Sequence, residues 1–434
     1  MKKVSLRVFS GFSLLLLPLP GGGLLFPPGR EPLPGPAQFQ RWVEELCAPA
    51  MAGRRACTKG GRLAADLVAR EFCLAGLKPA GERGSFFQEF PLKAPGAEGR
   101  TRNVLGLLEG RGPRADQVLV VSAHYDHLGM GGPESRWQGK PAVHPGADDN
   151  ASGVSCLLGL ARAFSRVRDR LGRSILFASW GAEEEGGLGS KWWLEHPTIP
   201  LERVVFLVNL DMVGHLRGKI LCGAAASAKG MPSLLRKLAG PAKVAVLGRS
   251  FGGSDHQNFL KKKIPAIHLF TGAWEGYHTP LDRPDKIDPR GIREVAGLAF
   301  RILSFESLSQ EPPVLDPEGM GSLALPRPKG ARPSLGTVPD FSQVRGGYKI
   351  AKVKKGSPAG KAGLRAGDLI VEFGGKPVDG FLDFVAALFS HLPGDQVEIQ
   401  VLRGGKRLKF QVKLGKAAGR PGARRGGKKG RPRR

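Results

Sequence analysis

Five short stretches of this 434-residue chain carry histidines and acids, and four of them stand at or just after apolar runs typical of buried strands. Imidazole and carboxylate groups are the ligands that catalytic zinc takes up, and one carboxylate can bridge two zinc ions. The pattern therefore predicts a metallohydrolase. The stretches are His124-Tyr-Asp126, Asp148-Asp149-Asn150, Glu183-Glu184-Glu185, Asn209-Leu-Asp211 and Tyr277-His278-Thr-Pro280.

The first stretch offers a metal ligand together with a partner for it. Residues two apart on a strand share a face, so His124 and Asp126 are expected to point the same way and His127 to point away. A zinc-bound imidazole usually donates its second N–H to a carboxylate. Asp126 is the candidate for that role.

Each of the other stretches also has an ordinary explanation. The residues around Asp149 would equally suit a helix N-cap, and acidic triplets are usually solvated surface. Asp211 could be a strand-end turn residue and His278 a loop histidine. The presence of all five stretches in this order favours a metal site. In such a site Asp149 would bridge two metal ions, and of two adjacent glutamates one would bind metal while the other transfers protons.

The elements expected around these stretches define an α/β domain. Strand-like runs cover residues 118–123, 174–180, 204–209 and 264–270, and helical patterns cover 62–77, 152–167, 188–195 and 291–305. Such alternation predicts a mixed, mostly parallel sheet with helices on both faces. Sites in these sheets form outside the carboxyl ends of the strands, which is where most of the stretches lie.

The chain divides into five parts. Residues 1–30 resemble a signal peptide or an N-terminal anchor, which predicts export to the periplasm or the outside of the cell, with or without retention at the membrane. Residues 38–310 form the α/β domain, 311–333 a Pro-rich linker and 334–415 a small β-rich domain. Residues 416–434 form a basic tail that is expected to be disordered.

Charge and cysteine content restrict the partners. The formal net charge of +28 favours anionic surfaces, to which the basic tail could attach, although compositional drift explains the charge more simply and nucleic acid is an unlikely partner. Five cysteines without close spacing argue against a thiolate zinc site or a disulfide framework. One bridge among Cys47, Cys57 and Cys73 stays open.

Residues 40–305 resemble the exported di-zinc aminopeptidases of the bacterial leucyl aminopeptidase type, which have a three-layer α/β/α zinc-exopeptidase fold. The motifs that carry the resemblance are Met51-Ala-Gly-Arg54, Gly76-Leu-Lys-Pro79, Arg102-Asn-Val104, Ala123-His-Tyr-Asp-His-Leu-Gly129, Gly146-Ala-Asp-Asp-Asn-Ala-Ser-Gly153, Ala182-Glu-Glu-Glu-Gly186, Asn209-Leu-Asp-Met212, Ser254-Asp-His256, Tyr277-His-Thr-Pro280 and Asp285-Lys-Ile-Asp288.

The resemblance implies two Zn²⁺ ions per chain. It places His124 and Asp211 on one zinc, Glu184 and His278 on the other, and Asp149 between them. Glu183 is then the general base, Asp126 supports His124, and Tyr277 is a candidate donor to the oxyanion. In this family the bridging aspartate often precedes a cis peptide bond, here Asp149–Asn150.

The chain departs from the family pattern at two positions. Cys57 stands where glycine is usual, and Glu185 adds an acid where an apolar residue is common, so the zinc ligand could shift by one residue. The spacing to Gly186 and to Gly189-Ser190 favours Glu184.

The second domain resembles a PDZ domain of the bacterial protease-associated kind, through Gly346-Gly347-Tyr348-Lys349-Ile350 and the stretch from Gly356 to Ile370. The resemblance implies binding of an extended peptide or protein C-terminus as an added strand, between residues 347–353 and a helix at 381–392. The amides near Gly346 would receive the terminal carboxylate. Alternatively, the groove stays empty and the domain only positions its neighbour.

Other functions fit the same residues. A single-zinc glutaminyl cyclase resembles this fold and ligand set, and a carboxypeptidase could use the same scaffold. A non-enzymatic reading is a PDZ scaffold with an inactive peptidase domain, although candidates for every ligand and for the base argue against it. A serine protease is disfavoured because the sequence has no Gly-x-Ser-x-Gly stretch.

Overall fold

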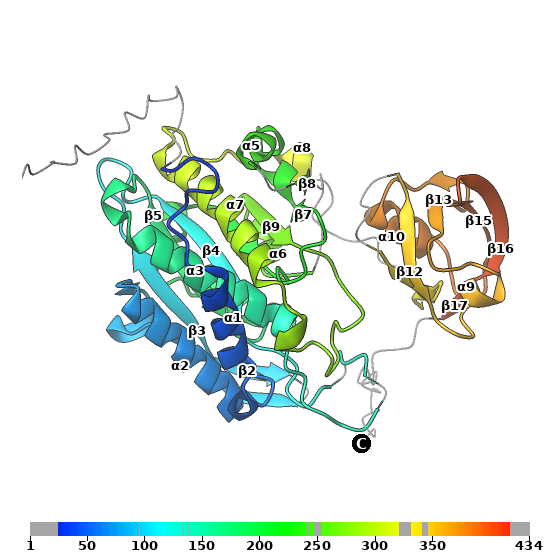
Figure 1. Ribbon diagram of the computed structural model, residues 1–434, viewed down its shortest axis with the longest axis horizontal. Helices are drawn as coiled ribbons and strands as arrows, with labels where there is room; N and C mark the ends of the chain where they lie inside the picture. Colours follow the sequence, from blue (N-terminus) through cyan, green and yellow to red (C-terminus); the bar gives the residue numbers. More distant parts are fainter. Residues whose placement is uncertain are drawn as a thin grey trace, which may run out of the picture.

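The computed structural model describes residues 25–94, 96–132, 134–137, 139–240, 243–246, 253–320, 331–340 and 346–416 (Figure 1). The apolar run predicted as a leader and the basic tail beyond residue 416 lie outside the described residues.

The first domain is built on a mixed sheet whose centre is parallel. Strands β5, β4, β6 and β9 are neighbours in that order and run parallel, whereas β3 pairs antiparallel with β5, and β7 pairs antiparallel with β9. The mostly parallel α/β architecture predicted from the sequence is thereby confirmed. The strands are β1 (Lys78–Pro79), β2 (Phe87–Ala94), β3 (Ala97–Leu108), β4 (Val118–His124), β5 (Ser174–Trp180), β6 (Val204–Leu210), β7 (Ile220–Gly223), β8 (Val244–Val246) and β9 (Ala266–Phe270).

Helices cover both faces of this sheet, so β4 and β5 are buried at every position. In β5, Ile175 and Phe177 pack into the cluster that contains α3 and α7, while Leu176 and Ala178 pack on the other face, against α4 and α6. Figure 1 shows α3 and α7 lying along the sheet. The helices of this domain are α1 (Pro36–Leu46), α2 (Lys59–Leu74), α3 (Gly153–Ser165), α4 (Leu188–Glu195), α5 (Met231–Leu238), α6 (His256–Lys261) and α7 (Pro289–Leu308), with a short α8 (Pro317–Met320).

Side-chain caps determine where two of these helices begin. The Thr58 hydroxyl accepts a hydrogen bond from the Gly61 N–H ahead of α2, and the Asp288 carboxylate accepts one from the Arg290 N–H at the start of α7. Pro289 follows as the first residue of α7, where its missing N–H costs nothing.

The N-terminal segment that comprises residues 25–35 packs against the first domain, so the domain begins earlier than the predicted boundary at Gln38. Leu25 and Leu33 are buried, and the Glu31 carboxylate forms a buried ion pair with Arg301 of α7. The same guanidinium donates to the carbonyls of Leu238 (2.7 Å) and Ala239 (2.9 Å) at the end of α5. This segment therefore joins α7 to α5.

The second domain is a small antiparallel sheet with two helices. The order of its strands is β11-β12-β13-β15-β16, which leaves β11 at an edge. The elements are β10 (Pro333–Ser334), β11 (Thr337–Pro339), β12 (Tyr348–Val353), α9 (Pro358–Lys361), β13 (Leu369–Phe373), β14 (Lys376–Pro377), α10 (Phe381–Phe389), β15 (Gln396–Arg403), β16 (Lys406–Lys413) and β17 (Gly415–Lys416).

Three smaller predictions can be compared with the structure. All five cysteines are free thiols, so no bridge joins Cys47, Cys57 and Cys73. At the start of the predicted linker, Val314 and Asp316 hydrogen-bond with the backbone of residues 227–229. Within the described part of the chain, no helix has the length and apolar content needed to cross a membrane.

We expect Glu31→Gln to lower the free energy of unfolding by about 3 kcal/mol, because it leaves the buried Arg301 guanidinium without a counter-charge. Glu45→Gln is the matched control, since its pair with Arg70 is exposed and contributes at most about 1 kcal/mol. Urea denaturation of both variants measures the difference. Equal unfolding midpoints would show that the N-terminal segment does not stabilise the domain.

Candidate functional site

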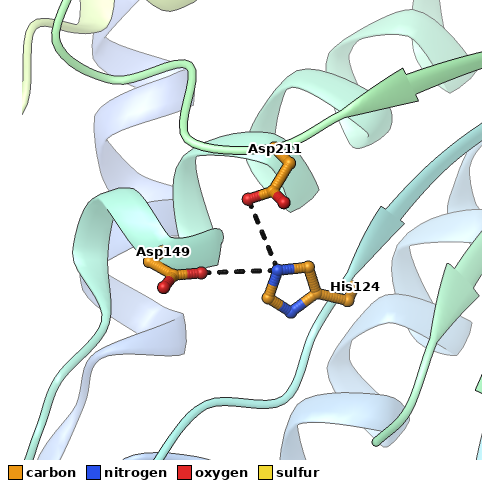
Figure 2. A group of neighbouring side chains, drawn as sticks. All are labelled: His124, Asp149 and Asp211. Atoms are coloured by element: carbon orange, nitrogen blue, oxygen red, sulfur yellow. Dashed lines mark ion pairs between the residues drawn. The ribbon is translucent and has the colours of Figure 1, made fainter. Parts of the chain in front are cut away.

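The predicted ligands meet at one end of the sheet because their strands end there. His124 is the last residue of β4, Asp211 follows β6, and Glu184 lies four residues beyond the end of β5. Asp149 precedes α3, and His278 comes from the loop after β9. Figure 2 shows the carboxylates of Asp149 and Asp211 turned toward the imidazole of His124.

The Asp149 carboxylate lies between two groups of donors. The distance from His124 Nε2 is 3.4 Å to Asp149 Oδ1 and 3.4 Å to Asp211 Oδ1. On the other side, His278 Nε2 is 3.0 Å from Asp149 Oδ2 and 3.2 Å from Glu184 Oε2. Ligands about 2.1 Å from a tetrahedral zinc are about 3.4 Å apart, so both groups have the spacing of zinc ligands.

The donor atoms also have the chemistry that zinc requires. His124 Nε2 and Asp211 Oδ1 are buried and have no hydrogen-bond partner among the described residues. Buried polar atoms without a partner are costly, so an ion that accepts their lone pairs would relieve the cost. His124, Asp149 and Asp211 form one group able to hold a metal, and the nitrogen and oxygen donors fit zinc.

The carboxylates and imidazoles change one another's proton affinity. Burial lowers the pKa of His278, but the Glu184 and Asp149 carboxylates outweigh burial and raise it to about 11. Burial likewise raises the pKa of Glu184, yet His278 and His127 bring it down to about 2. A site that holds protons this firmly on its imidazoles has a strong negative potential, which also favours metal cations.

The role predicted for Asp126 needs correction. Its carboxylate is 3.8 Å from His124 Nδ1, too far for a hydrogen bond, and the nearer contact of that nitrogen is the Asp126 carbonyl oxygen at 3.2 Å. The carboxylate instead accepts hydrogen bonds from the backbone N–H groups of Glu183 (3.0 Å) and Glu184 (3.2 Å). Asp126 therefore holds the acidic stretch in place.

The prediction that His127 points away from the site is wrong. Its Nδ1 is 2.7 Å from Glu184 Oε1, and its side chain is buried. The rule of alternating faces applies only while the chain is extended, and β4 ends at His124. The chain turns after that residue, which brings the His127 ring back toward the ligands.

Two further residues support the site and were not assigned a role from the sequence. The Asp282 carboxylate accepts hydrogen bonds from the N–H groups of Asp148 (2.9 Å) and Asp149 (3.1 Å). The buried Arg54 guanidinium donates to the carbonyls of Tyr125 (2.9 Å) and Gly146 (2.8 Å). Arg54 belongs to a motif that carried the family resemblance, whereas the only signal for Asp282 is its place four residues after His278.

The structure also accounts for the third acid of the triplet. Glu185 Oε1 is 3.4 Å from Arg55 Nε, so its side chain leaves the metal side and pairs with a cation. Glu184, in contrast, faces both His127 and His278. The Asp149–Asn150 peptide bond is cis, as the resemblance implied.

Glu183 and Tyr277 lie beside the ligands. Glu183 Oε2 is 3.9 Å from His124 Nε2. Burial and the nearby carboxylates of Asp255 and Asp211 hold the pKa of Glu183 well above its usual range, although His124 opposes them. The ring centroids of Tyr277 and His278 are 3.8 Å apart, and burial raises the pKa of Tyr277 well above its usual value, so its hydroxyl stays protonated.

In the second domain, the peptide-binding edge is not where the sequence placed it. Strand β12 is paired on both sides, with β11 and with β13, so it cannot accept another strand. The N–H groups of Gly346 and Gly347 already donate to Asp379, at 2.8 Å and 3.2 Å. The residues assigned to this role, Gly346, Gly347, Tyr348, Lys349 and Ile350, therefore lie inside the sheet or against Asp379. Among the described residues, the edge strands of this sheet are β11 and β16, and β11 is the one that pairs with β12.

The donor atoms of the site have the types and the spacing of zinc ligands. Residues 103–303 match the model of peptidase family M28, and residues 333–414 match the model of a PDZ domain. These two regions are thus similar in sequence to an M28 peptidase domain and to a PDZ domain.

Individual proteins resemble parts of the chain. Aminopeptidase YwaD of Bacillus subtilis is 27% identical over 247 residues, which are 54% of this chain and 51% of YwaD. A Zn-dependent exopeptidase from Parabacteroides distasonis (TM-score 0.52, 20% identity) and the glutaminyl cyclase of Porphyromonas gingivalis (TM-score 0.51, 22% identity) each match over 98% of their length, covering 62% and 63% of this chain. The chain spans about half the length, or less, of the curated relatives it matches, and at these identities the solved structures establish the fold alone.

Proposed function

We propose that this chain is a zinc-dependent aminopeptidase that binds two zinc ions and removes N-terminal residues from peptides. The proposal rests on the position of the Asp149 carboxylate between two groups of ligands. One of its oxygens faces His124 and Asp211, and the other faces His278 and Glu184. One carboxylate between two groups of ligands is the arrangement of a co-catalytic metal pair.

The charge of the site favours substrates with a free amino terminus. The site contains six carboxylates, and only three of them (Asp149, Glu184 and Asp211) are proposed zinc ligands. The substrate ammonium group would therefore enter a negative potential. The carboxylates are Asp126, Asp149, Glu183, Glu184, Asp211 and Asp255.

Bound zinc would lower the pKa of a water molecule toward ~7 and polarise the carbonyl of the scissile bond. Glu183 would act as general base toward the attacking water and as general acid toward the leaving amine. The protonated Tyr277 hydroxyl donates a hydrogen bond to the oxyanion.

A leucine-headed peptide offered with a free or an acetylated N-terminus tests the activity. The zinc-loaded protein is expected to release leucine from the free peptide alone, because acetylation removes the ammonium group. Quantification of free leucine gives the result, and a peptide headed by glutamine is the control for cyclisation. Formation of pyroglutamate without leucine release would instead support the glutaminyl cyclase alternative.

We expect Glu183→Gln to lower kcat by about 10² to 10⁴-fold and to keep both zinc ions, because it removes the proton acceptor and none of the proposed ligands. Glu185→Gln is the matched control in the same acidic stretch and should keep most of the activity, since that side chain pairs with Arg55. Turnover numbers and zinc content by elemental analysis are measured together. A Glu183→Gln enzyme as active as the wild type would rule out this base.

For the PDZ domain, we propose that a peptide adds to the outer edge of β11. Phe384 of α10 stacks on Tyr348 with ring centroids 3.9 Å apart, and the Tyr348 hydroxyl is 2.8 Å from Thr337 Oγ1, so α10 flanks this edge. Gly336 precedes β11 with φ +76°, and a Cβ there would lie 2.3 Å from that of Ser357. Backbone N–H groups around such a left-handed glycine can bind a terminal carboxylate.

Gly336→Ala should weaken the binding of peptides with a free C-terminus by about tenfold or more, the value of one hydrogen bond to a charged group. Gly346→Ala, at the loop first expected to bind the carboxylate, should bind as the wild type does. An array of peptides with free or amidated C-termini, probed with the full chain, measures both. Loss of binding in Gly346→Ala alone would contradict the assignment to β11.

A further inference from the structure

Glu184 shares its two carboxylate oxygens between different partners. Oε2 is 3.2 Å from His278 Nε2, on the metal side, whereas Oε1 is 2.7 Å from His127 Nδ1. An ionised carboxylate only accepts hydrogen bonds, so the proton of this contact belongs to His127 Nδ1. A carboxylate that binds zinc must be deprotonated, so Glu184 is the acceptor in this contact.

The distances separate His127 from the metal ligands. His127, Asp149 and Glu184 offer atoms that lie within 4.8 Å of one another, which is close enough to suggest a metal site. Two ligands of one zinc, however, are about 3.4 Å apart. His127 Nδ1 is 2.7 Å from Glu184, a hydrogen-bond length, and 3.9 Å from Asp149 Oδ2. His278 satisfies the ligand spacing to both carboxylates, and His127 satisfies it to neither.

The His127 ring is buried and packs closely against Gly146. Gly146 has φ +62°, and a Cβ at this position would lie 2.5 Å from the ring of His127, so only glycine leaves space for it. The Gly146 carbonyl is held by the Arg54 guanidinium at 2.8 Å. A buried imidazole fixed in this way is preorganised to orient its acceptor.

We infer that His127 is a positioning residue, which fixes the Glu184 carboxylate through its Nδ1–H so that Oε2 faces the zinc shared with His278. This inference rests on the proposed two-zinc function. His127 would support only one of the two ions, because among the described residues its ion pairs and hydrogen bonds reach Glu184 and Asp149 but neither His124 nor Asp211. Loss of the ring would let Glu184 rotate and would weaken one zinc site selectively.

Two substitutions at this position separate orientation from other roles. We expect His127→Ala to weaken the binding of one zinc ion by about 10 to 100-fold and to leave the other unchanged, the usual effect of losing a partner of a metal ligand. His127→Asn should restore most of the affinity, because its amide N–H can take the place of Nδ1–H. Titration of the metal-free full chain with zinc against a chromophoric chelator measures both sites without reference to activity.

Three results would overturn the inference. They are wild-type affinity at both sites in His127→Ala, equal weakening of both sites, and a His127→Asn protein that binds zinc as poorly as His127→Ala. Thermal unfolding of the metal-free variants shows whether each one folds. If His127→Ala does not fold, the zinc affinities of His127→Asn and the wild type are compared instead. A wild-type protein that binds a single zinc ion would refute the proposed function instead, and this is read from the wild type alone.

Discussion

Negative charge buried at the carboxyl ends of three neighbouring strands is the constraint that organises this molecule. Asp126, Asp149, Glu183 and Glu184 enter the same small volume, shielded from water, together with Asp211. Several like charges cannot be buried there unless cations or protons offset them. The histidines hold protons unusually firmly for this reason, and metal ions would replace those protons.

The chain holds these carboxylates in place mostly through its backbone. Two buried acids, Asp126 and Asp282, each accept two consecutive N–H groups, and each thereby fixes one of the acidic stretches. Arg54 completes the support by donating to main-chain carbonyls. Because backbone groups cannot change rotamer, this support is stiffer than contacts between side chains would be, and it keeps the ligand atoms at the spacing that a metal requires.

Much of the site could be predicted from the sequence because residue type and strand position carry the information. The mostly apolar sequences of β4 and β5 indicate a buried parallel sheet, and a metal site needs histidines and acids where such strands end. His127 could not be placed, because the two-residue period stops with the strand. The role of Asp282 could not be predicted either, since 133 residues separate it from the amide of Asp149. Only the folded chain brings them together.

The peptide-binding edge of the small domain was predicted wrongly for a related reason. Strand β11 comprises three residues, Thr337–Pro339, which is too short for any periodic pattern to reveal it. The paired glycines at 346 and 347 looked more like a carboxylate-binding loop, but their N–H groups donate hydrogen bonds to Asp379 instead. The resemblance identified the kind of domain correctly, and the pairing of the strands was needed to find its open edge.

That open edge ends in a proline. The Gly336 carbonyl and the Asp340 N–H form hydrogen bonds with the β12 side of the sheet. The backbone groups of Thr337 and Pro339 therefore point to the outer side of β11. Because proline has no N–H, the outer edge of β11 presents only the N–H of Thr337. An edge with so few donors is a poor template for a continuing ladder. The domain can thus leave a strand exposed in solution without inviting its own copies to pair along it.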